Sequence, residues 1–325
     1  MSHPLRIGVL RLADSAPIVV ARNAGLFERH GLSVDIAVSP SWANIADGLV
    51  WNGLDSALIF PPLAMMTALG RRGRKTGLRP VQAVSFGGNM IVLRGPARPG
   101  HDWTAGRAGH RSFRNWKADI GRTPRLAVVH AYSTHLLILT RFLSSIGISV
   151  QDDVQLKIMP PDRIIDALSA GSIDGFCAGP PWGEDAARQG LGFVVAGSAA
   201  ICPGHVEKVL VLNDQAHIEA ADLSRTLLAA LHDAIALCVD PANADDIARQ
   251  LAAPLAKGGL ALPFAATRAI MPDASLPDAM VFKSRSWDHE ALGWMVSDMQ
   301  GLGWISPEDV VSLERLGWLT QEMAR

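Results

Sequence analysis

One short stretch of this chain occurs twice, and that repeat constrains the fold more than any other feature. Residues 50–66, VWNGLDSALIFPPLAMM, resemble residues 169–185, SAGSIDGFCAGPPWGED. In each copy a helix-like stretch ends at a turn, an acidic residue opens a short apolar run, and a Pro-Pro pair starts another helix. Asp55 and Asp174 are 119 residues apart, as are the two Pro-Pro pairs. The constant offset predicts two lobes built from one α/β unit; a chance match between similar turns is the alternative.

The rest of the chain supports two lobes. A length of 325 residues suggests two domains of about 150 residues each. Short apolar runs alternate with longer helical patterns, which is typical of parallel α/β units. The expected strands are 5–12, 32–39, 55–60, 81–95, 125–133, 154–159, 173–178, 192–197 and 208–214, and the expected helices are 16–31, 42–52, 61–70, 134–146, 162–170 and 180–189.

We therefore predict an α/β fold of the two-lobed, periplasmic-binding-protein-like kind (type II), with a helical C-terminal extension. Lobe 1 is expected to comprise residues 1–95 and 205–325, including the C-terminal helices. Lobe 2 is expected over residues 96–204, which include a connecting segment, 96–124, rich in Gly, Pro and basic residues. In such a fold the carboxyl ends of the two sheets face one cleft, and each repeated corner brings a helix N-terminus to it.

Composition excludes some functions. Lys and Arg number 30 against 31 Asp and Glu, so no net field attracts nucleic acid or anionic lipid. The three cysteines are widely spaced without a CxxC pair, which argues against a disulfide framework or a zinc site. The N-terminus reads as a strand rather than a secretory signal, so a cytoplasmic location is expected unless a signal was removed.

Six segments resemble the nitrate- and bicarbonate-binding proteins of ABC importers. They follow that family's order over nearly the whole chain: SPSWANIADGL, GGNMIVL, STHLLILTRFLSSIGI, IDGFCAGPPW, GHVEKVLVL and FKSRSWDHEALGWMVSDM. The missing export signal makes the chain more similar to the family's cytoplasmic branch, the NasS-type nitrate/nitrite sensors. That resemblance implies a protein that restrains an RNA-binding antitermination partner of the ANTAR type (NasT-like) and releases it on binding nitrate or nitrite. It implies no cofactor, no direct contact with nucleic acid or membrane, and no catalysis.

The resemblance also implies a set of ligand-binding residues. Nitrate accepts hydrogen bonds but has no proton to donate, so its site should combine donors with one positive charge and lack acidic side chains. Lys208 matches the family's anion-pairing lysine, and since bicarbonate binders carry an acidic residue there that helps to hold a metal, lysine favours nitrate. The implied ligand-binding residues are Trp42, Ala43, Asn89, His135, Gly179 and Lys208.

Several of these residues have plainer alternatives. Lys208, beside Glu207, can be an ordinary surface lysine, and Trp42 can be a residue that packs within a lobe. Ala43 stands where the family has glycine, and Asn89 where it commonly has glutamine, so both depart from the family's pattern. Trp182 is expected to pack under a helix rather than to contact the ligand.

Two other functions remain open. An enzyme of the same general fold is one, although the chain shows no GxSxG, HExxH, Walker A or GxGxxG motif in a suitable context. A solute-binding component of an importer for nitrate or another small ligand is the other. For a sensor, Trp294, Trp304 and Trp318 in the C-terminal extension are candidate exposed contacts for the partner, or residues that pack against lobe 1.

Overall fold

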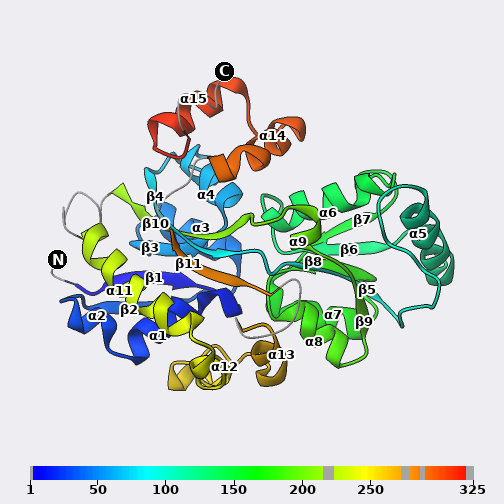
Figure 1. Ribbon diagram of the computed structural model, residues 1–325. Helices are drawn as coiled ribbons and strands as arrows, with labels where there is room; N and C mark the ends of the chain where they lie inside the picture. Colours follow the sequence, from blue (N-terminus) through cyan, green and yellow to red (C-terminus); the bar gives the residue numbers. More distant parts are fainter. Residues whose placement is uncertain (1–2, 215–222, 272–278, 286–289, 320–325) are drawn as a thin grey trace.

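The computed structural model describes residues 3–214, 223–271, 279–285 and 290–319, and these residues form two lobes, each built on one sheet (Figure 1). The strand order is β11-β4-β10-β3-β1-β2 in the first lobe and β7-β6-β8-β5-β9 in the second. The predicted pair of α/β lobes is therefore confirmed. The strands are β1 (Leu5–Val9), β2 (Val34–Val38), β3 (Ser56–Ile59), β4 (Leu78–Phe86), β5 (Met90–Arg94), β6 (Arg125–Val128), β7 (Gln155–Ile158), β8 (Gly175–Ala178), β9 (Gly192–Gly197), β10 (Val206–Asn213) and β11 (Val281–Arg285).

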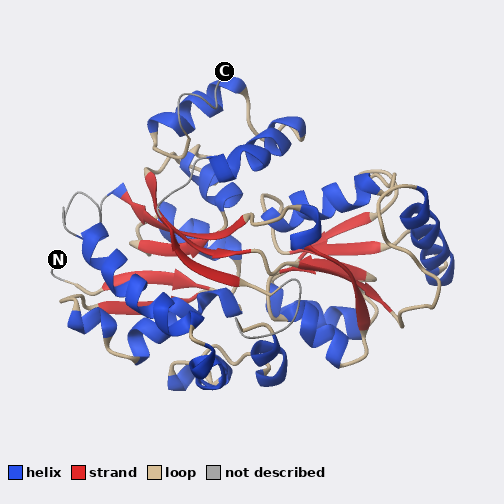
Figure 2. Cartoon of the chain, viewed as in Figure 1, coloured by secondary structure: helices blue, strands red, loops and turns tan. Residues whose placement is uncertain are grey.

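Helices cover both faces of each sheet (Figure 2). The α-helices are α1 (Ala16–Asn23), α2 (Leu26–Arg29), α3 (Trp42–Val50), α4 (Pro61–Ala68), α5 (Arg107–Ile120), α6 (Thr134–Ser145), α7 (Ile164–Ser169), α8 (Trp182–Arg188), α9 (Ser198–Ile201), α11 (Leu223–Val239), α12 (Ala244–Ala252), α13 (Phe264–Ala269), α14 (Gly293–Gly301) and α15 (Pro307–Arg315). Short 3-10 helices are η1 (Ala13–Ser15), η2 (Pro161–Arg163), η3 (Pro241–Asn243), η4 (Leu255–Lys257) and η5 (Glu290–Leu292).

The repeat seen in the sequence is a repeat of strand pairing. In the first lobe β3 pairs antiparallel with β10, with Ile59 opposite Val209; in the second β8 pairs antiparallel with β5, with Ala178 opposite Met90. Both residues of the second pair lie 119 positions from their counterparts. Each lobe thus receives its antiparallel strand from a segment that crosses over from the other.

The crossing explains one departure from the expected sheets. Residues 81–95 were expected to complete the first sheet, but the chain leaves it after Phe86, and β5 pairs with β8 and β9 in the second sheet. Gly87 and Gly88 take φ of 67° and 83°, values that glycine adopts readily, and they separate β4 from β5. The largely apolar segment 81–95 therefore contains strands of both lobes, and its sequence does not mark where the chain passes from one to the other.

The acidic residue of each repeated corner has a structural role. Asp55 Oδ2 accepts a hydrogen bond from the backbone N–H of Arg6 at 2.8 Å, and Asp174 Oδ2 accepts one from the backbone N–H of Arg125 at 2.9 Å. Arg6 and Arg125 are also 119 residues apart. The carboxylates join the starts of neighbouring parallel strands, whereas the prolines follow the opposite, carboxyl ends of β3 and β8.

Two helical assignments differ from expectation. The predicted helix 16–31 is divided into α1 and α2 at Gly25, whose φ of 64° interrupts a helix. The connecting segment 96–124 contains α5, which packs Phe113 and Trp116 against the second lobe and exposes about half of its other side chains. Its single apolar stripe is short, which explains why the pattern was missed.

The C-terminal extension contacts both lobes (Figure 1). Arg141 of α6 forms an ion pair with Asp298 of α14, with Nε 2.6 Å from Oδ2. Trp318 is fully buried, and its indole N–H donates to the carbonyl of Leu78 at 2.9 Å. Trp304 is half-buried with its ring 5.3 Å from that of Tyr132, and the half-buried Trp294 packs against both hydrophobic cores. The interpretation of Trp318 as an exposed contact is therefore wrong, and packing against lobe 1 holds for it. Trp294 and Trp304 are only partly exposed, and their contact with a partner stays a prediction.

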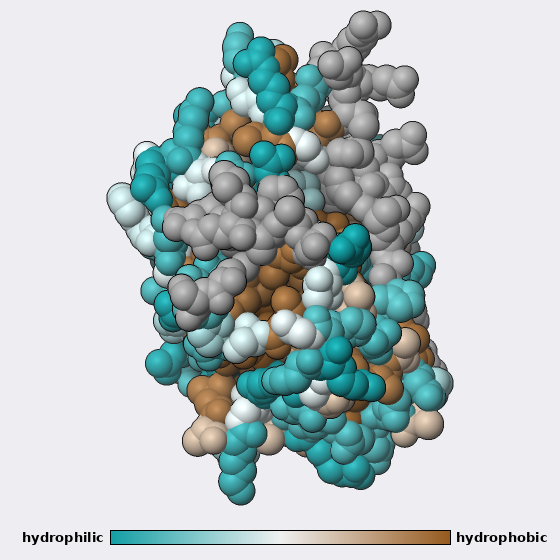
Figure 3. All heavy atoms as spheres, turned by 90° about the vertical axis from the view of Figure 1, so that its left-hand side faces the viewer, coloured by the Kyte–Doolittle hydropathy of each residue, from teal (hydrophilic) through white to brown (hydrophobic). Residues whose placement is uncertain are grey.

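Parts of the expected C-terminal extension, including part of the segment FKSRSWDHEALGWMVSDM, fall on residues 215–222, 272–278, 286–289 and 320–325, which lie outside the described part of the chain. Within that part no single helix is long and apolar enough to span a bilayer, although α11 and the segment Pro241–Ala252, bent by 80°, pass that test together. The face on the left of Figure 1 is largely hydrophilic, with apolar side chains gathered near its middle (Figure 3).

Candidate functional site between the lobes

The site is assembled where the two lobes meet. Ser41 and Ser133 cap α3 and α6, their hydroxyls accepting hydrogen bonds from the backbone N–H of Asn44 (3.3 Å) and Leu136 (3.1 Å). Serine is a favoured N-cap because it satisfies an N–H that the helix cannot. Each cap fixes the first turn that follows it, and these first turns carry Trp42 in the first lobe and His135 in the second.

A buried ionic cluster lies at the centre of the site. Lys208 is fully buried, with Nζ 2.8 Å from Asp14 Oδ2 and 2.6 Å from Glu207 Oε1. Asn89 Nδ2 donates to Glu207 Oε2 at 2.6 Å, and the Nε2 atoms of two histidines lie 3.3 Å (His205) and 3.6 Å (His135) from the same carboxylate. We call Asp14, Asn89, His135, His205, Glu207 and Lys208 the interlobe cluster.

A bulge in β10 brings Glu207 and Lys208 together. Consecutive residues of a regular strand point to opposite faces of the sheet. The pairing of β10 with β4 shifts register on both sides of Lys208, and every residue of the strand is buried. Bulges redirect side chains in this way. The alternative of Lys208 as an ordinary surface lysine is excluded.

Burial and neighbouring charges shift the pKa values of the cluster residues in different directions. Burial raises the pKa of Asp14, an effect that Lys208 opposes. Burial would also raise the pKa of Glu207, but Lys208 and the two histidines hold it well below its usual value. For Lys208 the two carboxylates outweigh burial and raise the pKa, so the ammonium stays charged. Burial lowers the pKa of His135 to about 4, despite the opposing effect of Glu207.

Several buried polar atoms around the cluster have no hydrogen-bond partner among the described residues. They are Trp42 Nε1, Asn89 Oδ1, Thr134 Oγ1 and both ring nitrogens of His135. Gly179 lies against two of these atoms, because a Cβ built there would be 3.4 Å from His135 Nε2 and 3.5 Å from Asn89 Oδ1. Buried polar groups are normally hydrogen-bonded, so this group of atoms indicates a place for a small polar ligand.

Aromatic rings form one wall of that place. The rings of Trp42 and Phe60 lie 4.5 Å apart, and Phe60 meets His135 edge-on at 5.8 Å. Lys208 Nζ lies 5.2 Å from the Trp42 ring centroid. An apolar wall beside fixed polar groups excludes water and strengthens electrostatic contacts with a ligand.

Five of the six predicted binding residues converge at the cluster, namely Trp42, Asn89, His135, Gly179 and Lys208. Ala43 lies beside Trp42 in the first turn of α3 and is half-buried. Their roles in binding a ligand stay predictions. The expectation that acidic side chains are absent is wrong, because Asp14 and Glu207 are both buried there.

Sequence reasoning missed Asp14, His205 and Glu207. Asp14 stands in a short 3-10 turn after β1, with no motif around it. Glu207 was visible beside Lys208, but strand alternation argued against both pointing inward. The only available signal was charged residues, E and K, inside the otherwise apolar run VEKVLVL.

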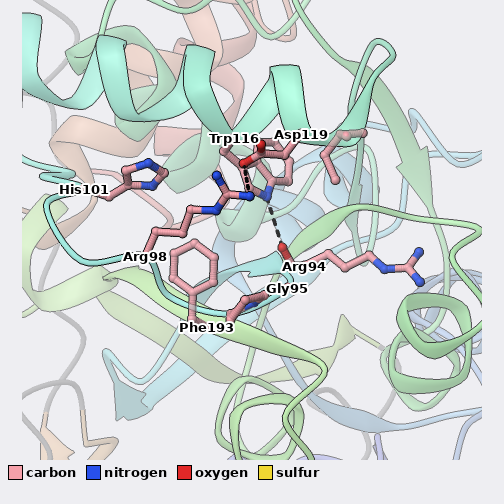
Figure 4. Close-up of a pocket in the computed structure, with 9 residues that line it drawn as sticks. Arg94, Gly95, Arg98, His101, Trp116, Asp119 and Phe193 are labelled. Atoms are coloured by element: carbon pink, nitrogen blue, oxygen red, sulfur yellow. Dashed lines mark hydrogen bonds and ion pairs between the residues drawn. The ribbon is translucent and has the colours of Figure 1, made fainter.

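A pocket of about 180 Å³ lies on the second lobe between α5 and the strands β5 and β9, away from the interlobe cluster. Its Arg98 pairs with Asp119 at 2.9 Å, Trp116 donates to the carbonyl of Arg94, and the Arg94 side chain points away (Figure 4). The guanidinium that faces the pocket is therefore already paired.

No group of three or more His, Cys, Asp and Glu side chains among the described residues is arranged to hold a metal ion.

Two lobes with matching strand orders, crossing segments and a polar cluster buried between them define a two-lobed, periplasmic-binding-protein-like fold. Residues 2–252 match the NMT1-like family, and the chain belongs to that family.

Similarity to individual proteins agrees with this assignment. The chain is 35% identical over 257 residues to the nitrate import ATP-binding protein NrtC of Synechocystis, covering 77% of this chain and 37% of that protein. It is 33% identical over 248 residues to the bicarbonate transport ATP-binding protein CmpC of Synechococcus elongatus, covering 75% and 36%. The chain thus spans little more than a third of the length of these relatives.

The fold is also found in solved structures. The periplasmic nitrate-binding protein NrtA of Synechocystis superposes with a TM-score of 0.85 at 18% identity, covering 99% of this chain and 86% of NrtA. The alkanesulfonate-binding protein SsuA of Xanthomonas axonopodis, bound to MOPS, gives a TM-score of 0.65 at 16% identity, covering 92% of each chain.

Proposed function

We propose that this protein binds nitrate or nitrite between its lobes and signals the bound anion through contact with another protein. The observation that carries the proposal is the buried group of unpartnered polar atoms beside Lys208 and against Gly179. Trp42 Nε1, a ring nitrogen of His135 and the Thr134 hydroxyl can each donate to an oxyanion, and Lys208 supplies positive charge.

Micromolar binding is within reach of such a site. It corresponds to about 8 kcal/mol, and a hydrogen bond to a charged group contributes about 1.5 to 3 kcal/mol. Three donors and one ammonium suffice when the lobes already sit close to the bound arrangement. Burial of Asn89, His135 and Lys208 supports that condition, since it holds these groups together between the lobes.

Thermal unfolding and calorimetry test the ligand. Nitrate and nitrite should raise the melting temperature, and Trp42→Phe should weaken nitrate binding about tenfold to a hundredfold because the ring is kept and the N–H is lost. Trp182→Phe is the matched control, since its indole N–H is also buried without a partner but belongs to α8. Stabilisation by bicarbonate alone, or unchanged nitrate affinity in Trp42→Phe, would contradict the proposal.

Bicarbonate is the second candidate ligand, and Asn89 favours it. The Nδ2 of Asn89 donates to the ionised Glu207, so its Oδ1 faces Gly179 as an unpartnered acceptor. Bicarbonate has a hydroxyl to donate there, whereas nitrate has none. Bicarbonate, with and without calcium, therefore belongs in the same titration series.

The signalling part of the proposal draws on the C-terminal extension. Because it contacts α6 through Arg141–Asp298 and β4 through Trp318, relative movement of the lobes must change its contacts. A ligand that favours closed lobes releases a partner that prefers open ones. The proposed partner is an RNA-binding antitermination protein of the ANTAR type (NasT-like), and the proposed location is the cytoplasm.

Co-purification tests this output. Nitrate at saturation should dissociate the complex, and a hundredfold loss of partner affinity requires about 2.7 kcal/mol of coupling. A complex that survives saturating nitrate and nitrite would refute the signalling role. Binding of nitrate without any partner would favour the rival function, a solute-binding component of an importer, which the names of the relatives support.

A further inference from the structure

The interlobe cluster holds two carboxyl groups for one ammonium before any ligand binds. Asp14 and Glu207 both contact Lys208, and all three side chains are at most 1% exposed. An anion placed beside Lys208 therefore meets two acidic groups as well as one cation. Since unpaired charge is heavily penalised in a buried site, a bare monoanion needs a second positive charge close by.

His135 is placed to provide that charge. Its ring is fully buried, and neither nitrogen has a hydrogen-bond partner in the described part of the chain. Nε2 faces Gly179 on one side, and it lies 3.6 Å from Glu207 Oε1. An imidazolium here would touch a carboxylate and a bound anion together, which favours its charged form.

Asp14, whose pKa burial raises, is another candidate proton acceptor in the cluster, whereas the remaining titratable groups near His135 are engaged or neutral. His205 already uses both nitrogens, Nδ1 at 3.1 Å from the carbonyl of Cys202 and Nε2 at 3.3 Å from Glu207. Burial raises the pKa of Cys177 well above its usual value, so that thiol is neutral. His130 faces Phe60 and is influenced by Arg72 and Asp47, which lie outside the cluster.

We propose that His135 takes up one proton when nitrate or nitrite binds, so that anion and proton enter the interlobe cluster together. The inference rests on the proposed function. The proton comes from solvent and binds the free imidazole, giving an imidazolium that donates to the anion while Glu207 stabilises it. Without the anion, a pKa of about 4 keeps His135 neutral at pH 7. The negative ligand raises that pKa.

Calorimetry of the wild-type protein with potassium nitrate and sodium nitrite measures the proton directly. Titrations at pH 7 in buffers of different ionisation enthalpy should show between about half and one proton taken up per anion, and affinity should fall about tenfold to a hundredfold from pH 6 to pH 8. Bicarbonate, which carries its own proton, should bind without such uptake if it binds at all.

Variants assign the proton to a residue. His135→Gln keeps a side-chain donor but cannot titrate, so proton uptake and the pH dependence of affinity should both disappear. His130→Gln is the matched control, because it changes another buried histidine near Phe60, and it should retain proton uptake. Asp14→Asn tests the other candidate acceptor, and uptake that persists in this variant supports His135.

The outcomes separate the two proposals. Anion binding without buffer dependence, and with constant affinity from pH 6 to pH 8, would overturn the proton uptake while leaving the proposed function intact. Loss of uptake in Asp14→Asn but not in His135→Gln would overturn the assignment to His135. Absence of nitrate and nitrite binding at every pH would instead refute the proposed function. If His135→Gln does not fold, the wild-type titrations still decide whether a proton is taken up, and Asp14→Asn still decides whether Asp14 accepts it.

Discussion

Replacing Lys208 by methionine should unfold the protein more easily at neutral pH than at acid pH. The substitution keeps the length of the side chain but leaves Asp14 and Glu207 buried without their ammonium. Removing one partner of a buried ion pair typically costs about 3 to 5 kcal/mol. Protonation of Asp14 in the folded chain sets an upper limit on the loss of stability, because it removes one of the two buried charges. Burial already raises the pKa of Asp14 and so favours this protonation.

The cost of that protonation depends on pH. For a carboxyl with an unfolded pKa near 3.9, it is about 4 kcal/mol at pH 7 and about 1.5 kcal/mol at pH 5, or 1.36 kcal/mol for each pH unit. A folded-state pKa raised above the unfolded value gives stability that is present at low pH and lost as pH rises. The destabilisation should therefore grow from about 1.5 to about 4 kcal/mol between pH 5 and pH 7.

Urea unfolding at both pH values, followed by tryptophan fluorescence and circular dichroism, measures this change. The double variant Lys208→Met with Asp14→Asn is the control. It should recover most of the loss and remove the pH dependence, because the carboxyl that had to be protonated is gone. A loss below about 1 kcal/mol at pH 7, or an equal loss at both pH values, would refute this reasoning. In the single variant Lys208→Met, the free energy of nitrate binding should weaken by about 2 kcal/mol or more, because the anion loses its counter-charge.

Three further substitutions probe other parts of the structure. Gly179→Ala should leave stability nearly unchanged, since its Cβ would meet His135 at an ordinary 3.4 Å, yet weaken nitrate binding at least tenfold in calorimetry by filling the ligand's place. Asp174→Asn should cost about 2 to 3 kcal/mol in urea unfolding, because this buried carboxylate pairs with two arginines, whereas Asp55→Asn should cost about 1 kcal/mol. Arg141→Ala should cost about 1 kcal/mol or less, since its ion pair is partly exposed, but should reduce the nitrate-dependent release of a partner in co-purification.

Much of the fold was predictable because both copies of the repeat show the same local sequence pattern of acidic residue, apolar run and Pro-Pro pair. The run after Asp55 and the run after Asp174 became β3 and β8, and the Pro-Pro pairs mark their carboxyl ends. The exchange of β5 and β10 between the lobes was not predictable from those patterns. Strand propensity is identical in either sheet, and only the tertiary pairing decides where a strand goes.

The candidate site likewise contains residues that local sequence patterns predict and residues that only tertiary contacts place. Trp42 and His135 follow serine caps that can be recognised in sequence, so their positions in first turns were predictable. The partners of Lys208 were not, because Asp14 lies 194 residues away in sequence and the bulge in β10 reverses the alternation that Glu207 should follow. Long-range ionic contacts leave no periodic signal in a single sequence.

The interlobe cluster also couples ligand binding to the relative position of the two lobes. Asp14 belongs to the first lobe, His135 to the second, and Asn89 to the segment that crosses between them. Glu207 contacts His135 and Asn89, and Lys208 contacts Asp14. Opening the lobes would hydrate these charges, and hydration offsets much of what the buried contacts gain, so closure without a ligand is only weakly favoured by the cluster. An anion that binds together with a proton adds two matched charges to the closed form alone. The free energy of that added pair is then available to shift the balance between open and closed lobes, and the shift cannot exceed the ligand's differential affinity for the two forms.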